Sequence, residues 1–298
     1  MHVGETVVTL TQAAGLLAAQ FPAWAALPLV PLTVAGSDNV MIRLGDDLVL
    51  RFPRLPGAVA ALESEAVWLG WIRGTVPLAV PEMVAMGRPG DGYPFPWAVQ
   101  RWIAGQNAWD APVQDLAAAQ ALADFVVALR ARPVPVEVPV KGGSLADRDG
   151  FLRQMIARLA DEADPRQVAR AWDTALALPS WDGAPVLVHA DLHPLNLLVH
   201  NGKLAAVIDW GAFGAGDPAL DLICGWTVLH SAGRALFRKR LSVDDATWAR
   251  GWAFALSKAV MAAPYYRDSN PPLHAVMRRS LRRCLAERPD CMEPPLWI

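Results

Sequence analysis

The segment Val186 to Gly211, VLVHADLHPLNLLVHNGKLAAVIDWG, places polar side chains in strands that are otherwise apolar. These polar residues are His189, Asp191, Asn196 and Asp209. Short apolar strands tolerate such side chains only where partners compensate for the lost hydration. The spacing His-x-Asp-x-x-x-x-Asn, followed by an aspartate at the end of a strand, is typical of sites that transfer a phosphoryl group.

A predicted β-hairpin would bring two of these side chains together. Asn201-Gly202 predicts a type I′ turn, because both central positions of that turn require a positive φ. Pairing the flanking strands across this turn puts Asn196 roughly opposite Val207. Asn196 and Asp209 then lie at the same open end of the hairpin. An amide oxygen and a carboxylate meeting there form a hard, oxygen-rich cation site that suits Mg²⁺.

Asp191 lies in the loop that enters the first strand of this hairpin, where a base for an incoming hydroxyl is needed. The same loop allows a second interpretation, since His189, Asp191 and His193 form an H-x-D-x-H pattern. Alternate residues of a strand share one face, so these three side chains could converge on a transition metal. The alternative function is therefore a metal-dependent hydrolase.

With the following GDPALDL motif (residues 216–222), the segment resembles the aminoglycoside phosphotransferase family, relatives of the eukaryotic protein kinases. The resemblance implies a bilobal protein-kinase-like fold of the α+β class. It also implies that Asp191 is the catalytic base, that Asn196 and Asp209 are Mg²⁺ ligands, and that His189 supports the loop.

Two positions depart from the relatives' usual pattern. Ala190 stands where the family usually has glycine, so we expect a small local change in the loop. Trp210 follows the metal-binding aspartate, where protein kinases have phenylalanine. In the GDPALDL motif we expect Asp217 to be a helix N-cap before Pro218, and Asp221 to brace the catalytic loop.

Strand signals dominate the first hundred residues, and helical periodicity dominates the remainder. We expect a hairpin over 39–44 and 48–52, a helix over 58–73 and a strand over 97–103. The later helices are predicted over 113–131, 145–163, 166–178, 217–231, 243–263 and 273–287. The predicted lobes are 1–102, which binds nucleotide, and 103–298, which holds the catalytic loop, the metal site and the acceptor pocket.

Arg51 and Glu65 are the charged pair expected in the first lobe. A kinase site normally has a lysine on a strand that holds the α- and β-phosphates, but the chain has no lysine before Lys141. Arg51 is in the right place on its strand to take that role. Glu65 falls in the middle of the apolar face of helix 58–73, whereas Glu63 points away. A carboxylate at that position needs a cation, and Arg51 is the expected partner.

By the same resemblance, the loop before the first hairpin lies over the nucleotide phosphates, with Ser37 and Asn39 as binding residues. The strand WAVQRWI, which contains Gln100 and Trp102, corresponds to the hinge that receives the nucleobase through backbone groups. Backbone recognition leaves little trace in side chains, so the sequence does not separate ATP from GTP as the donor.

The composition does not favour several classes of partner. Hydrophobic residues make up 53% of the chain and charged residues 19%, with a net charge of −2. Nothing in this balance favours a nucleic acid or an anionic membrane, and we expect the basic run 278–283 to form a solvated helix face. Three cysteines, the absence of a basic region at the N-terminus and the absence of a spanning apolar run predict a cytoplasmic protein.

The leading prediction is a Mg²⁺-dependent small-molecule kinase that moves the γ-phosphoryl group of ATP or GTP to a hydroxyl. The acceptor is an aminoglycoside, another antibiotic, or a metabolite such as choline, homoserine or a sugar. Acidic residues of the second lobe are candidates to attract a cationic acceptor: Asp147, Asp149, Asp161, Glu162, Asp164 and Asp268. We expect a monomer or a homodimer.

Overall fold

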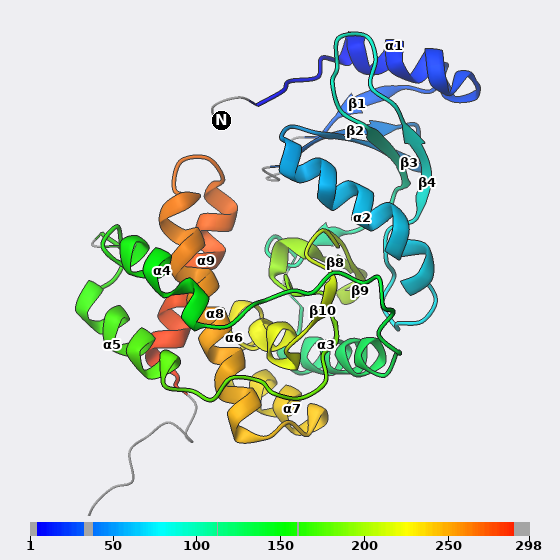
Figure 1. Cartoon of the computed structure of the whole chain (residues 1–298). Coiled ribbons are helices and arrows are strands. Elements are labelled where there is room, and N and C mark those ends of the chain that lie inside the picture. The colour runs from blue at the N-terminus through cyan, green and yellow to red at the C-terminus, as the bar shows by residue number, and fades with distance from the viewer. Residues whose placement is uncertain (1–4, 33–37, 112, 160, 289–298) are drawn as a thin grey trace, which may run out of the picture. The chain divides into compact units, whose positions relative to one another are not determined.

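The computed structural model describes residues 5–32, 38–111, 113–159 and 161–288 (Figure 1). Its chain forms two compact units. The first unit comprises Met1–Gly74, Ala79–Ala104 and Ile208–Gly211, and the second comprises Thr75–Leu78, Gly105–Val207 and Ala212–Ile298. The functions assigned to residues 1–102 and 103–298 stay predictions.

An antiparallel sheet with the order β1-β2-β3-β5-β4 forms the centre of the first unit. Its strands are β1 (Leu29–Pro31), β2 (Asn39–Leu44), β3 (Leu48–Pro53), β4 (Met83–Gly87) and β5 (Trp97–Arg101). The predicted hairpin is β2–β3, and the predicted strand over 97–103 is β5. All of β3 is buried, because the neighbouring strands β2 and β5 flank it and helices cover the sheet.

Two helices pack against this sheet (Figure 1). Helix α1 (Leu10–Gln20) begins with a capping box between Thr9 and Gln12. Helix α2 (Pro56–Ile72) contacts β3, β4 and β5. Trp97 is fully buried in the core beside Phe52, and its ring lies against Gly87, where any Cβ would clash.

The second unit is mainly helical. Its α-helices are α3 (Asp115–Arg130), α4 (Asp149–Ile156), α5 (Pro165–Leu176), α6 (Cys224–Thr227), α7 (Ser231–Leu241), α8 (Asp245–Tyr265) and α9 (Pro271–Ala286). Helix α8 is central, since it contacts α4, α5, α6, α9 and the 3₁₀ segment η4 (Pro218–Ile223). The sheet-based first unit and the helical second unit confirm the predicted α+β class.

Two helix predictions need correction, and one helix was missed. The stretch predicted as one helix over 217–231 is the 3₁₀ segment η4 followed by the single turn α6. Helix α7 was not predicted at all. The helix predicted over 145–163 is only α4, preceded by the 3₁₀ turn Ala146–Arg148. Several polar residues that interrupt the helical pattern in these stretches instead accept backbone hydrogen bonds, as Asp147 does from Ser144.

Small strands complete the second unit. Strands β7 (Val186–Val188) and β10 (Gly214–Gly216) pair with each other, and β6 (Gln106–Asn107), β8 (Leu197–His200) and β9 (Lys203–Val207) form a second sheet. The Asn201-Gly202 turn is confirmed, with φ of 50° and 72°. A bulge between Leu198 and Val199 shifts the predicted register, so that Leu197, not Asn196, pairs with Val207.

The prediction of a solvated basic face on 278–283 is also wrong for part of that run. Arg279 donates to the Thr227 carbonyl at 3.0 Å, and its guanidinium lies over the Trp109 ring. Arg283 donates to the carbonyls of Trp226 and Val228. These arginines satisfy carbonyl groups at the C-terminal end of α6. In the described part of the chain, every helix is too short or too polar to cross a bilayer.

Candidate active site

The loop between β7 and β8 carries the predicted catalytic residues. Two histidines fix its backbone: His189 Nδ1 accepts a hydrogen bond from Asp191 N at 3.2 Å, and His193 Nδ1 accepts one from Leu195 N at 3.3 Å. His193 thereby caps the 3₁₀ turn Pro194–Asn196. The loop is therefore held by its own side chains in a single defined path.

Asp221 braces this loop from η4, as predicted. Its two carboxylate oxygens accept hydrogen bonds from the backbone N–H groups of His189 at 3.1 Å and Ala190 at 2.7 Å. Burial raises the pKa of Asp221, against the opposing effects of His189 and Arg130. Ala190 has a φ of 63°, the left-handed conformation that glycine adopts most easily, so the expected local effect at this position is present.

Asp191, the predicted base, is partly buried and surrounded by basic side chains. Its Oδ1 forms an ion pair with Lys258 Nζ and lies 3.5 Å from His193 Nε2. Burial opposes ionisation, but Lys258, His193 and His189 outweigh it and hold the pKa of Asp191 well below its ordinary value. Burial also lowers the pKa of His193 to about 4. Asp191 is therefore an ionised carboxylate beside a neutral imidazole at neutral pH.

Lys258 was missed in the sequence analysis. It lies on α8, and the signal that points to it is its position as the single charged residue of the apolar run 251–263, GWAFALSKAVMAA. A lysine in such a run needs a carboxylate partner or a route to water. Its side chain is 25% exposed and its partner is Asp191.

Asn196 is oriented by the same loop. Its Nδ2 donates to the Asp191 carbonyl at 3.0 Å, which turns the amide oxygen away from that contact. An oriented amide oxygen is a suitable ligand for Mg²⁺. Asn196 belongs to the second unit and Asp209, the other predicted ligand, to the first. Asp209 has a φ of 61°, and its charge acts on Arg51.

Arg51, Glu65 and Gln100 form a buried polar cluster in the first unit. Arg51 Nη1 pairs with Glu65 Oε2, which also accepts a hydrogen bond from Gln100 Nε2 at 3.3 Å. The other Glu65 oxygen accepts the Trp210 backbone N–H at 2.9 Å. Burial works to lower the pKa of Arg51, but Glu65 and Asp209 raise it overall. The predicted pairing of Arg51 with Glu65 is confirmed.

The other residues predicted to contact the nucleotide are Ser37, Asn39 and Trp102. Ser37 lies outside the described residues. Asn39 begins β2 and has a buried side-chain oxygen that has no hydrogen-bond partner among the described residues. The Trp102 N–H donates to the Asp47 carbonyl at 2.7 Å, and Arg43 lies 4.1 Å from its ring centroid. That backbone N–H is therefore already engaged, and the role of Trp102 in binding a nucleobase stays a prediction.

The geometry does not favour the hydrolase alternative. Within the described residues, no three His, Cys, Asp or Glu side chains gather in a way that would hold a metal ion. His189 and His193 each use Nδ1 to fix the loop backbone, and the Asp191 carboxylate pairs with Lys258. The H-x-D-x-H pattern therefore orders the loop.

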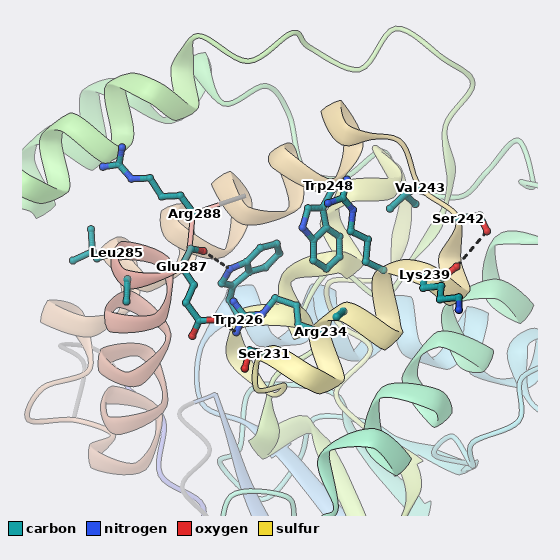
Figure 2. A pocket seen from close by; sticks show the side chains of 13 residues that line it. Trp226, Ser231, Arg234, Lys239, Ser242, Val243, Trp248, Leu285, Glu287 and Arg288 are labelled. Carbon is teal, nitrogen blue, oxygen red and sulfur yellow. Dashed lines mark hydrogen bonds and ion pairs between the residues drawn. The ribbon is translucent and has the colours of Figure 1, made fainter. Parts of the chain in front are cut away.

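A cavity of about 820 Å³ lies elsewhere in the second unit, between α7, the start of α8 and the end of α9 (Figure 2). Trp226 and Trp248 form part of its wall, and Arg234 pairs there with Glu287 at 2.9 Å. None of the predicted catalytic or metal-binding residues lines it. This cavity is therefore separate from the predicted catalytic and metal-binding residues.

Comparison with known proteins identifies the family. The model of the phosphotransferase enzyme family matches residues 31–255, which is most of the chain. The chain belongs to this family. The predicted resemblance is thus confirmed, and with it the assignment to a family of transferases whose fold is related to that of kinases.

Individual relatives agree with this assignment. An aminoglycoside 3′-phosphotransferase from Escherichia coli is 27% identical over 196 residues, covering 62% of this chain and 70% of the relative. The solved GDP complex of an aminoglycoside 2′-phosphotransferase-IIIa variant superposes with a TM-score of 0.74 at 22% identity, covering 96% and 100% of the two chains. A macrolide 2′-phosphotransferase type I gives a TM-score of 0.62 at 23% identity, covering 93% and 98%. The kinase-like α+β fold is confirmed by these structures.

Proposed function

We propose that this protein transfers the γ-phosphoryl group of ATP or GTP to a hydroxyl of a small molecule. The observation that carries the proposal is the environment of Asp191, an ionised carboxylate held by Lys258 on a loop braced by Asp221. A positioned carboxylate is suited to accept the proton of an attacking hydroxyl. Family membership supplies the reaction class.

In the proposed step, the acceptor oxygen forms a bond to the γ-phosphorus while the bond from that phosphorus to the β–γ bridging oxygen breaks. The electron pair of the broken bond stays with the nucleoside diphosphate, and the hydroxyl proton moves to Asp191. Little covalent chemistry is required of the protein, so positioning and charge stabilisation supply most of the rate.

Asn196 and Asp209 are the proposed ligands of Mg²⁺. An oriented amide oxygen and a carboxylate fit this hard cation, and Asn196 is held in place by its hydrogen bond to the Asp191 carbonyl. When bound, the ion neutralises charge on the phosphates of the donor. Asp209 is connected to the donor side of the site through its neighbour Trp210, whose N–H donates to Glu65.

Arg51 is the proposed contact for the donor phosphates. Glu65 holds one nitrogen of its guanidinium, and the planar group has further donors for phosphate oxygens. Ser37 and Asn39, together with Gln100 and Trp102 of the hinge segment, are the other proposed nucleotide contacts. GDP in the similar aminoglycoside 2′-phosphotransferase-IIIa supports a nucleotide donor and gives reason to test GTP beside ATP.

The acceptor class is open between antibiotics and metabolites. The similar proteins named above act on aminoglycosides or macrolides, as their names state. The acidic residues suggested for attracting a cationic acceptor are largely engaged: Glu162 pairs with Arg267 at 3.0 Å, and Asp149 pairs with Arg153 at 2.9 Å. Buried free thiols at Cys224 and Cys284 support our proposal of a reducing, cytoplasmic location.

The experiment is a screen of hydroxyl compounds for nucleotide-dependent phosphorylation with both ATP and GTP. The panel should contain aminoglycosides, macrolides, choline, homoserine and sugars. Asp191→Asn is the control, because an amide cannot take the proton; it should keep nucleotide affinity and lose about 10²–10⁴-fold in kcat. Wild-type protein that binds neither nucleotide and phosphorylates nothing would refute the proposed function, and undiminished kcat in the variant would refute the role of Asp191.

A further inference from the structure

Lys258 is the charged side chain closest to the proposed base, and its contacts are unusual for a purely structural ion pair. It pairs with Oδ1 of Asp191, the oxygen that His193 also approaches. That oxygen is buried, whereas the two side chains as wholes keep access to solvent, at 25% exposed for Lys258 and 22% for Asp191. An ammonium group on a base reduces the affinity of that base for a proton. A fixed pair would therefore weaken the base during catalysis.

The backbone that carries Lys258 is rigid, but its side chain is long. Ser257, Ala259 and Val260 are fully buried, and Ser257 accepts a hydrogen bond from Arg148 at 3.1 Å. The helix therefore holds the Lys258 Cα in place. The four-carbon stem and three N–H donors of lysine allow the ammonium to change partners without movement of the helix.

The chemistry of transfer provides a second partner at short range. A hydroxyl bonded to Asp191 lies about 2.6–3.2 Å from the carboxylate, and a γ-phosphorus poised for attack lies about 3–3.5 Å from the hydroxyl oxygen. A cation in contact with Asp191 is therefore within reach of the equatorial phosphoryl oxygens, on which charge is spread in the transition state.

On these grounds we propose that Lys258 is a second catalytic residue, which leaves Asp191 Oδ1 as the acceptor's proton reaches the Asp191 carboxylate and binds an oxygen of the phosphoryl group being transferred. This inference rests on the proposed function. The bonds formed and broken are those described above, and Lys258 contributes charge and hydrogen bonds without gaining or losing a proton.

The test uses the full chain and needs no knowledge of the acceptor. Water takes the place of the hydroxyl in the hydrolysis of Mg²⁺-ATP and Mg²⁺-GTP, and aluminium fluoride with the nucleoside diphosphate imitates the phosphoryl group in transit. The variants are Lys258→Met, which keeps the length and removes the charge, and Lys258→Arg. Lys203→Met, at an exposed position on β9, is the matched control.

We expect Lys258→Met to lower kcat for hydrolysis about 10²-fold, the usual effect of removing one transition-state donor. Its affinity for the diphosphate alone should stay within about twofold of wild type, and the added affinity with aluminium fluoride should disappear. Lys258→Arg should restore part of the kcat and part of the added affinity with aluminium fluoride, and Lys203→Met should change neither quantity.

Two results would overturn the inference. One is an unchanged kcat together with undiminished aluminium fluoride binding in Lys258→Met. The other is a parallel decrease in melting temperature and in diphosphate affinity in both Lys258 variants. That result would show that the lysine is only a structural partner of Asp191. Failure of wild-type protein to bind any nucleotide is a different result, since it would remove the proposed function itself.

Discussion

At the scale of single residues, the backbone of Ala190 offers a direct test of how the catalytic loop is held. Its φ of 63° is costly for a residue with a Cβ, and Asp221 stabilises it by accepting the Ala190 N–H at 2.7 Å. We predict that Ala190→Gly raises the free energy of unfolding by about 0.5–1 kcal/mol. Chemical denaturation measures this.

Gly202 supplies the reverse control for that substitution. Its φ is 72°, and a Cβ there would meet no atom within 4 Å. A substitution at this position therefore acts through the backbone conformation and not through a steric clash. Gly202→Ala should lower the free energy of unfolding by about 1 kcal/mol. A stabilising effect of Gly202→Ala, or a destabilising one of Ala190→Gly, would contradict the conformational argument.

His193 gives a prediction about pH. Burial lowers its pKa from 6.5 in the unfolded chain to about 4, so between these values the unfolded chain binds more protons than the folded one. Stability must therefore fall as pH decreases from about 6.5 to 4, by about 3 kcal/mol from this residue. The pKa of Asp191 is depressed in the folded protein, so its stabilising contribution is lost only when the pH falls below the pKa of Asp191 in the unfolded chain. His193 and Asp191 therefore affect stability in different pH ranges.

The measurement is urea denaturation of wild type and His193→Asn at several values of pH. Asparagine keeps an acceptor for the Leu195 N–H that His193 now binds, so the loop retains its cap. The variant should show a smaller decrease in stability from pH 6.5 to 4. Equal decreases in the two proteins would mean that His193 titrates normally.

At the scale of elements, one buried ion pair ties β3 to α2. Arg51 is 7% exposed and Glu65 1%, and Glu65 also binds Gln100 of β5 and the Trp210 N–H. Removing one partner leaves the other charge buried and should cost about 3–5 kcal/mol. We predict that Arg51→Ala and Glu65→Ala are strongly non-additive in a double-mutant cycle, in stability and in nucleotide affinity.

Glu63→Ala is the control for this cycle, because Glu63 lies on the exposed side of the same helix. It should change stability by less than about 0.5 kcal/mol. Strict additivity of Arg51→Ala and Glu65→Ala in both measurements would show that the ion pair contributes neither to the fold of the first unit nor to nucleotide binding.

Elements also show what the sequence could reveal and what it could not. The hairpin turn at Asn201-Gly202, the N-cap at Asp217 and the pairing of Arg51 with Glu65 follow from local chemistry and helical periodicity, and all were predictable. The bulge between Leu198 and Val199 lies in β8, which pairs with both β6 and β9, and no turn rule places it. Lys258 and Asp191 are distant in the sequence, so only the tertiary fold reveals their contact.

At the scale of the whole molecule, the two proposed metal ligands belong to different compact units. The short segment Ile208–Gly211 belongs to the first unit although the residues on either side of it belong to the second, and it carries Asp209. Asn196 belongs to the second unit. Each proposed ligand can be tested separately through the stability of the entire chain.

We predict that nucleotide raises the stability of wild type more in the presence of Mg²⁺ than in its absence, by up to about 2.7 kcal/mol at a concentration one hundred times Kd. Asp209→Ala should abolish the Mg²⁺-dependent part, because it removes the charged ligand, and Asn196→Ala should reduce it less. Thermal melting with ATP and GTP, each with Mg²⁺ or a chelator, measures the effect. Asp46→Ala, an exposed acid in the β2–β3 turn, should leave it unchanged. An intact Mg²⁺-dependent increment in Asp209→Ala would rule out Asp209 as the metal ligand.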